Sequence, residues 1–321
     1  MTKNKPAIGI DVGRYHIHLV ILAREGKSFK LMDFASLDLN PEQGREEKVR
    51  NLQKLLEQKQ LSGSKVNIGV SGESVIVRYI DLPNMKDEEI SQALEYEAQQ
   101  YIPFKMEEVI FDYHILKRGG PNNKVKILLV AAKKEAIIQF IQFIEQSNLI
   151  VNLIEVDAFS LINCFQANGP KIKPENVSAL VNLEYDLVNM NILQGEVPYF
   201  TRDISLIEED GLSLWREKSK PGELFERIRP FLENLIRELR LSLDYFENEF
   251  GKPVQNIYLS GQGAGLSQMV ECFSTQLGRA VSLWNPMQNL VIDSSAVDNQ
   301  LLKRSAPMLA IACGLALRGA E

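Results

Sequence analysis

The stretch IGIDVGRYHI, residues 8–17, joins an apolar strand to a turn that contains Asp11 and Gly13. A strand followed by an acid and a glycine is typical of phosphate-binding loops, because a glycine lets backbone N–H groups approach phosphate oxygens. Such loops usually continue with small hydroxyl residues, whereas this one continues with Arg14 and Tyr15. The sequence leaves two alternatives open for this turn: a working phosphate loop, or a fold kept for another task.

Composition and charge narrow the class of protein. The chain has 321 residues, 45% of them hydrophobic and 24% charged, which is ordinary for a globular protein of about two domains. With a formal charge of −6 the chain is acidic as a whole, so its net charge does not indicate binding to nucleic acid or anionic lipid. The longest apolar runs are far shorter than the roughly 20 residues of a membrane span. Cys164, Cys272 and Cys313 are far apart in the sequence, so we expect buried thiols in a reducing cytoplasm.

The apolar pattern divides the chain into recurring units. Residues 7–39 alternate as three meandering strands, and a helix over 46–60 and a strand over 65–72 follow. From about residue 75 a small βαββαβ unit of roughly 80 residues interrupts this pattern. The strand meander then recurs in VSALVNLEY, LVNMNILQ and VPYFTRDISL, which indicates an internal repeat. Residues 221–250 carry an apolar stripe at helical spacing, so we expect this helix to pack on a sheet.

A glycine-rich turn follows a later strand, in NIYLSGQGAGL at residues 256–266. A dinucleotide fingerprint would need a glycine where Leu266 stands and an acid about 20 residues further on, and this sequence has neither. The turn therefore does not predict a Rossmann fold.

Three loops, taken in order, resemble those of the actin-like ATPase fold. IGIDVGRYHIHLV, ALVNLEYDLVNMNI and NIYLSGQGAGL stand where that fold has its first phosphate loop, second phosphate loop and adenosine loop. EYEAQQYIPFKMEEVIFDYHIL, VDAFSLINCF, VPYFTRDISL and APMLAIACGLALRG further resemble the PilM family, the cytoplasmic actin-like proteins of type IV pilus machines. The related FtsA family ends in a membrane-binding amphipathic helix, and no such helix precedes Glu321.

The resemblance implies the fold and its division. We expect an α/β protein with the actin-like ATPase fold, a duplicated ribonuclease H-like fold, and an inserted small α/β subdomain of the FtsA/PilM type. Subdomain 1A would comprise residues 1–78 with 157–175 and the C-terminal helix 303–321. The inserted subdomain 1C would comprise residues 79–156, and domain 2 residues 176–302.

The resemblance also implies a nucleotide site, with ATP and Mg as cofactors. Asp11 would hold the metal through water and Gly13 would admit a phosphate, while His18 takes the polar position further along the strand. Arg14 would either contact a phosphate or fill its place. In the second loop Asn182 replaces the metal-facing acid, and Glu184 brings like-charge repulsion worth at least about 1 kcal/mol.

The third loop keeps its small residues but has Gln262 where a glycine is usual. We therefore expect hydrolysis to be lost and nucleotide binding to be weakened or lost. If binding is retained, the candidate residues are Asp11, Gly13, Arg14, Tyr15, Asn182, Gly261, Gly263 and Ala264.

Six further residues have competing interpretations. Glu155 or Asp157 could orient a catalytic water, although for Asp157 we favour capping of the helix that follows. Tyr101 and Phe104 flank Pro103, and either line a cleft for a partner peptide or pack the end of a helix. His16 and His18 share one face of a strand, but we expect no zinc site, because His114 is the only other histidine and no cysteine is near.

The resemblance implies a binding scaffold in type IV pilus assembly or in a related type II secretion system. The expected partner is the cytoplasmic tail of PilN, a single-span membrane protein, held between subdomains 1A and 1C. Pilus ATPases and further copies of the chain are additional candidate partners. We expect a cytoplasmic protein that reaches the inner membrane through its partner. The alternative is an active actin-like ATPase that switches or polymerises with ATP.

Overall fold

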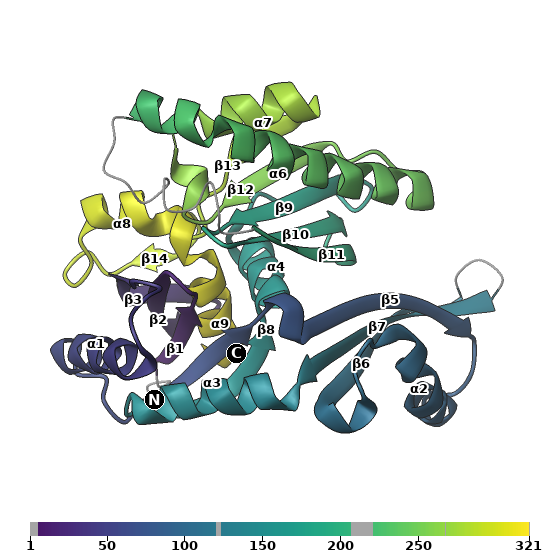
Figure 1. Ribbon diagram of the computed structural model, residues 1–321, viewed down its shortest axis with the longest axis horizontal. Helices are drawn as coiled ribbons and strands as arrows, with labels where there is room; N and C mark the ends of the chain where they lie inside the picture. The colour runs from purple at the N-terminus through teal and green to yellow at the C-terminus, as the bar shows by residue number, and fades with distance from the viewer. Residues whose placement is uncertain (1–5, 120–122, 207–220, 267, 321) are drawn as a thin grey trace.

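The computed structural model describes residues 6–119, 123–206, 221–266 and 268–320, and Figure 1 shows the arrangement of their helices and strands. The first sheet has the strand order β14-β3-β2-β1-β4-β8. Strands β1 to β3 form an antiparallel meander, whereas β4 and β8 continue the sheet in parallel. The bounds are β1 (Ala7–Val12), β2 (His16–Glu25), β3 (Ser28–Asp38), β4 (Lys65–Val70), β8 (Ile150–Val156) and β14 (Val291–Ile292).

The second sheet repeats this order as β11-β10-β9-β12-β13. Its register places Asn182 opposite Asn189, as the first sheet places Asp11 opposite His18. The predicted internal repeat is therefore present, and its two phosphate-loop positions are equivalent in the two sheets. The bounds are β9 (Val177–Leu183), β10 (Leu187–Gln194), β11 (Val197–Ser205), β12 (Asn256–Ser260) and β13 (Ala280–Leu283).

Two helices, α4 (Asp157–Asn168) and α9 (Ala310–Ala320), lie between the two sheets (Figure 1). Their buried side chains share one apolar cluster with β2 and β3 and with Leu180 and Leu193 of the second sheet. The helices approach closely where Gly314 meets Ser160, because a Cβ atom on residue 314 would collide with the Ser160 carbonyl oxygen. Next to them, α8 (Asn299–Ser305) and the 3₁₀ turn η5 (Ala306–Leu309) complete the central layer.

Further helices cover the outer faces of the sheets. Helices α1 (Arg45–Gln58) and α3 (Lys134–Gln146) pack on the first sheet. Helix α6 (Pro221–Phe250) and helix α7 (Met269–Leu277) pack on the second. The apolar stripe of α6 is buried at Leu232, Leu239 and Phe246, so the prediction that this helix packs on a sheet is confirmed.

A three-stranded sheet, ordered β5-β7-β6, extends from the rest of the molecule at the right of Figure 1, and we call it, together with its helix, the insert. Its elements are β5 (Val75–Pro83), α2 (Asp87–Tyr101), β6 (Val109–Lys117) and β7 (Lys124–Lys133). Helix α2 buries Ile90, Leu94 and Ala98 against one face of the sheet. The insert also contacts the second sheet, where the Tyr79 hydroxyl lies 3.1 Å from the Thr201 hydroxyl.

Strand pairing crosses two of the domain limits that we predicted. From the predicted insert, 79–156, α3 packs under the first sheet and β8 pairs with β4. From predicted domain 2, 176–302, strand β14 pairs with β3 in the first sheet. The predicted limits themselves remain predictions.

Two other expectations concern the whole chain. No helix among the described residues is long and apolar enough to span a membrane. Cys164 and Cys313 are buried as expected, whereas Cys272 is half-buried.

Candidate functional site

A cavity of about 300 Å³ lies between the two repeats. It is formed by the β1–β2 turn, the loop after β4, the start of α4 and the β9–β10 turn. Four of the predicted nucleotide-site residues meet there: Asp11, Gly13, Arg14 and Asn182. The structure thus brings the first and second loops together across one cavity, as the predicted fold requires.

The third loop does not contribute to the described lining of this cavity. Gly261 has a φ of +90°, and its N–H donates to the Pro307 carbonyl oxygen at 2.7 Å. Gly263 and Ala264 are buried in the 3₁₀ turn that follows. Gly261 is therefore accounted for by its close packing against η5 and the end of β9.

Tyr15 is likewise not among the described residues that line the cavity. It is buried, and its ring meets the ring of Tyr185 edge to face, with centroids 6.0 Å apart. This pair joins the two loop turns. The guanidinium of Arg14 lies over the Tyr15 ring, 5.6 Å from its centroid, while the residue itself stays exposed.

The side chain of His16 occupies the space over Gly13. A Cβ atom on residue 13 would lie 2.8 Å from both ring nitrogens of His16, and the Gly13 N–H donates to the His16 carbonyl oxygen at 3.0 Å. In the second loop, the Glu184 N–H donates in the same way to the Leu187 carbonyl oxygen. The N–H groups of Gly13 and Glu184 are thus already paired within the protein, and the His16 ring packs directly against Gly13.

His16 lies between two carboxylates that come from different repeats. Its Nε2 is 3.4 Å from Asp11 Oδ2, and its Nδ1 is 3.8 Å from Glu184 Oε2. Burial acts to lower the pKa of His16, but the charges of Glu184 and Asp11 outweigh it and raise this pKa to about 9. Burial raises the pKa of Glu184 to about 7, against the opposing effect of His16.

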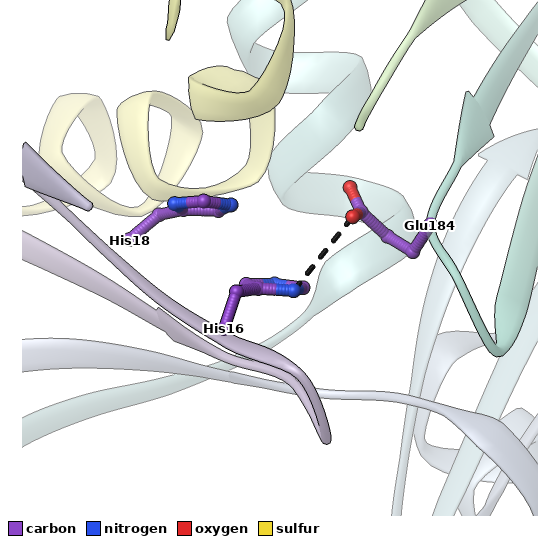
Figure 2. Close-up of side chains that lie close together, drawn as sticks. All are labelled: His16, His18 and Glu184. Carbon is purple, nitrogen blue, oxygen red and sulfur yellow. Dashed lines mark ion pairs between the residues drawn. The ribbon is translucent and has the colours of Figure 1, made fainter. Parts of the chain in front are cut away.

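His18 stacks on His16, with ring centroids 4.2 Å apart and planes inclined by 16° (Figure 2). Its Nδ1 lies 3.0 Å from the Ser36 hydroxyl, and its Nε2 has no hydrogen-bond partner among the described residues. Burial, and the neighbouring His16, hold the pKa of His18 well below its ordinary value. His18 is therefore a neutral imidazole beside a cationic one.

Asn182 is held by hydrogen bonds within the site. Its amide nitrogen donates to Glu184 Oε1 at 2.9 Å, and its oxygen accepts from the Ser260 hydroxyl at 2.7 Å. The Asn182 amide, which stands where an acid was expected, thus holds Glu184 toward His16.

Of the two candidates for orienting a water, only Asp157 lines the cavity. The prediction that Asp157 caps a helix is wrong, because Val156 is the N-cap residue of α4 and no side chain caps this end. Burial, with the charge of Asp11, raises the pKa of Asp157 well above its ordinary value. Glu155 lies instead 3.4 Å from Arg318 and lines a different hollow.

The charged side chains that line the cavity are mostly acidic. The described lining carries one guanidinium and the His16 imidazole against five carboxylates, those of Asp11, Glu73, Asp157, Glu184 and Asp186. A polyphosphate needs converging N–H groups and cations. The residues present therefore fit a magnesium nucleotide poorly.

A larger hollow of about 700 Å³ separates the insert from the first sheet, and we call it the insert groove. Its walls are the face of β6 and β7 opposite α2, together with β8, α4 and α9. The apolar side chains that line it include Ile110, Leu128, Val130, Ala132, Ile137, Ile154 and Phe159.

Tyr101 and Phe104 are not among the described residues that line the insert groove. Both pack on the apolar cluster under α2, on the other side of the insert sheet, and Lys133 Nζ lies 4.4 Å from the Phe104 ring centroid. Their role in binding a partner remains a prediction, and the geometry agrees with the packing interpretation.

Comparison with known proteins assigns the family. Residues 9–206 and 216–320 match the family described as type IV pilus assembly protein PilM. The chain belongs to this family. A solved PilM–PilN type IV pilus biogenesis complex contains a similar chain, 24% identical, with a TM-score of 0.86 and coverage of 99% of both chains.

More distant likeness supports the fold of this PilM-family chain. The ethanolamine utilization protein EutJ from Carboxydothermus hydrogenoformans is 12% identical, with a TM-score of 0.56 over 98% of this chain and 89% of that one. The actin-like fold predicted from the sequence is confirmed. At these identities the likeness to solved structures concerns the fold alone.

Proposed function

We propose that this PilM-family chain is a scaffold of a type IV pilus, or related type II secretion, inner-membrane assembly complex. In this proposal it holds the cytoplasmic tail of a PilN-like membrane protein in the insert groove. The supporting observations are the family match and the likeness to a chain from a PilM–PilN complex. The observation that carries the proposal is the groove itself, a large apolar hollow between two sheets.

The insert groove suits an extended peptide because of its walls and its edges. Leu128, Val130 and Ala132 alternate along β7 and face the groove, while Phe159 faces them from α4. Among the described strands, β6 pairs only with β7 and β8 pairs only with β4, so both keep an unpaired edge beside the groove. A tail could add to either edge and place alternate apolar side chains in the hollow.

The rim of the groove adds polar contacts. Arg318 and Glu155 form an ion pair 3.4 Å long there, and Asp112 and His114 lie on the exposed face of β6. Such groups set the register and orientation of a bound segment more than its affinity. Through this tail the chain would be located at the cytoplasmic side of the inner membrane.

The proposal includes weakened or lost binding of Mg-ATP. His16 fills the space over Gly13, and Glu184 adds a carboxylate to a cavity that already holds four others. The alternative, an active ATPase, requires a nucleotide to displace the His16 ring and overcome this charge. Pilus ATPases and further copies of the chain remain candidate partners of the scaffold.

The test measures binding of a fluorescently labelled peptide with the tail sequence of the PilN-like protein from the same genome. Val130→Arg places a charge in the groove and Phe159→Ala removes part of its wall, so each should weaken binding at least about 10-fold. Tyr96→Ala, at an exposed position of α2, is the matched control and should bind as the parent does. Equal affinities for all the variants, each folded by its thermal unfolding profile, would contradict the proposal.

A further inference from the structure

Three side chains form a buried cluster across the cavity between the repeats (Figure 2). His16 and His18 come from β2, and Glu184 comes from the β9–β10 turn. Their exposed fractions are 2%, 1% and 7%. Each offers one nitrogen or oxygen atom, and these atoms lie within 4.8 Å of one another. The cluster therefore joins the first repeat to the second.

Both imidazoles have one ring nitrogen held by a neighbouring oxygen. His18 Nδ1 lies 3.0 Å from the Ser36 hydroxyl, and His16 Nε2 lies 3.4 Å from Asp11 Oδ2. His16 Nδ1 is thereby left 3.8 Å from Glu184 Oε2. Histidines that bind metal are usually oriented in this way, with one nitrogen on a carboxylate or hydroxyl and the other on the ion.

Two atoms of the cluster lack hydrogen-bond partners among the described residues, His18 Nε2 and Glu184 Oε2. Leaving buried polar atoms unpaired is costly, and such atoms in a native structure call for an explanation. A single cation bound between them would satisfy both at once.

We propose that His16, His18 and Glu184 bind a divalent transition-metal ion of the zinc class, contrary to the sequence-based expectation of no zinc site, because the second repeat supplies the third ligand. Asp11 orients His16, which releases its extra proton to solvent when the ion binds. Two neutral imidazoles and two carboxylates then surround one divalent ion, so the charges balance. Imidazole nitrogens select zinc, cobalt or nickel over magnesium, which prefers oxygen ligands. The site is distinct from a magnesium nucleotide site, since its ligands include the two histidines.

Binding requires a small rearrangement. Ligand atoms on a tetrahedral ion lie about 3.3 Å apart at zinc–nitrogen distances near 2 Å, so the cluster must contract. The imidazole rings, stacked at 4.2 Å, must also splay to direct their nitrogens at one ion. Because the ligands come from both repeats, the contraction draws the Glu184 turn toward β2.

The test titrates chelator-treated protein, purified without a histidine tag, with Co²⁺ and Zn²⁺. We expect one ion per chain and visible ligand-field bands of bound Co²⁺. His18→Gln and Glu184→Gln remove ligands and should weaken binding at least about 100-fold, whereas Ser36→Ala removes an orienting group and should cost about 10-fold. His114→Gln, at an exposed position of β6, is the matched control and should bind as the parent does.

Absence of a bound ion in the parent protein would overturn the proposal. Equal Zn²⁺ affinities of the parent and Glu184→Gln would also overturn it. Glu184→Gln preserves the shape of the side chain, so it serves as the test if His18→Gln fails to fold. A Mg²⁺ affinity equal to that of Zn²⁺ would likewise contradict histidine ligation. Peptide binding, measured on the same preparations, shows separately whether the scaffold proposal holds.

Discussion

The imidazole of His16 lies over Gly13, so close that a Cβ atom on residue 13 would be 2.8 Å from both of its ring nitrogens. In the sequence, the glycine after Asp11 indicates a place for a phosphate. In the structure, the same lack of a side chain makes room for a buried histidine, which contacts Asp11 on one side and Glu184 on the other. The glycine is therefore explained without a ligand.

Replacing Asp157 by asparagine should change how stability depends on pH. The pKa of Asp157 in the folded chain lies well above its ordinary value of 3.8, so the native state binds this proton more tightly than the unfolded state does. Ionisation of Asp157 therefore lowers the free energy of unfolding as the pH rises from about 4 through the pKa of the folded state. Above that pKa the loss levels off.

Asp157→Asn should accordingly raise the free energy of unfolding at pH 8 by about 1–3 kcal/mol and have less effect at pH 5. Urea unfolding at both pH values measures this difference. Asp244→Asn, an exposed position of α6, should leave stability unchanged at both. An equal loss of stability in Asp157→Asn at pH 5 and pH 8 would show that the carboxyl is not strained by its burial.

Gly314→Ala should destabilise the central layer. The added methyl group would collide with the Ser160 carbonyl oxygen, so α4 and α9 must move apart, at a cost of about 2–4 kcal/mol. Thermal and urea unfolding measure the loss. Gly265→Ala is the matched control, because no atom lies within 4 Å of the position of its Cβ atom. Similar unfolding midpoints for the two variants would refute the close crossing.

The contact between the insert and the second sheet should be separable from the fold. The Tyr79 hydroxyl lies 3.1 Å from the Thr201 hydroxyl, and Lys126 Nζ lies 4.9 Å from the Phe250 ring centroid. Tyr79→Phe combined with Lys126→Met removes both contacts, each worth about 1 kcal/mol.

Amide hydrogen exchange in β5 and β11 should then become about fivefold faster or more, since 1 kcal/mol is a factor of about five. Lys105→Ala, on the exposed side of the insert, serves as control. Unchanged exchange in both strands would mean that the two contacts do not hold the insert in place.

Much of the fold could be predicted from the sequence because its signals are local. The strand meanders, the repeat and the apolar stripe of α6 follow from hydrophobic spacing and turn residues. The pairing of β8 with β4, and of the two-residue strand β14 with β3, joins segments far apart in the chain. No local pattern encodes such pairing, so these strands could not be placed in advance.

The site was predictable only in part, for the same reason. The alternation of His16 and His18 and the loss of the acid at Asn182 were visible in the sequence. That Glu184 faces His16 depends on how the two repeats are packed together. Only alignment of the repeats, which places Glu184 where the first repeat has Gly13, could have suggested it.

The central claim is that the chain binds a peptide in the insert groove and that its binding of Mg-ATP is weakened or lost. Thermal unfolding of the purified chain, with the PilN-like tail peptide or with millimolar Mg-ATP, tests both parts at once. A peptide at 100 times its Kd stabilises the native state by about 2.7 kcal/mol, so the midpoint should rise by several degrees, while Mg-ATP leaves it unchanged. A rise with Mg-ATP that disappears in Asp11→Ala, without any effect of the peptide, would contradict the account and support the ATPase alternative.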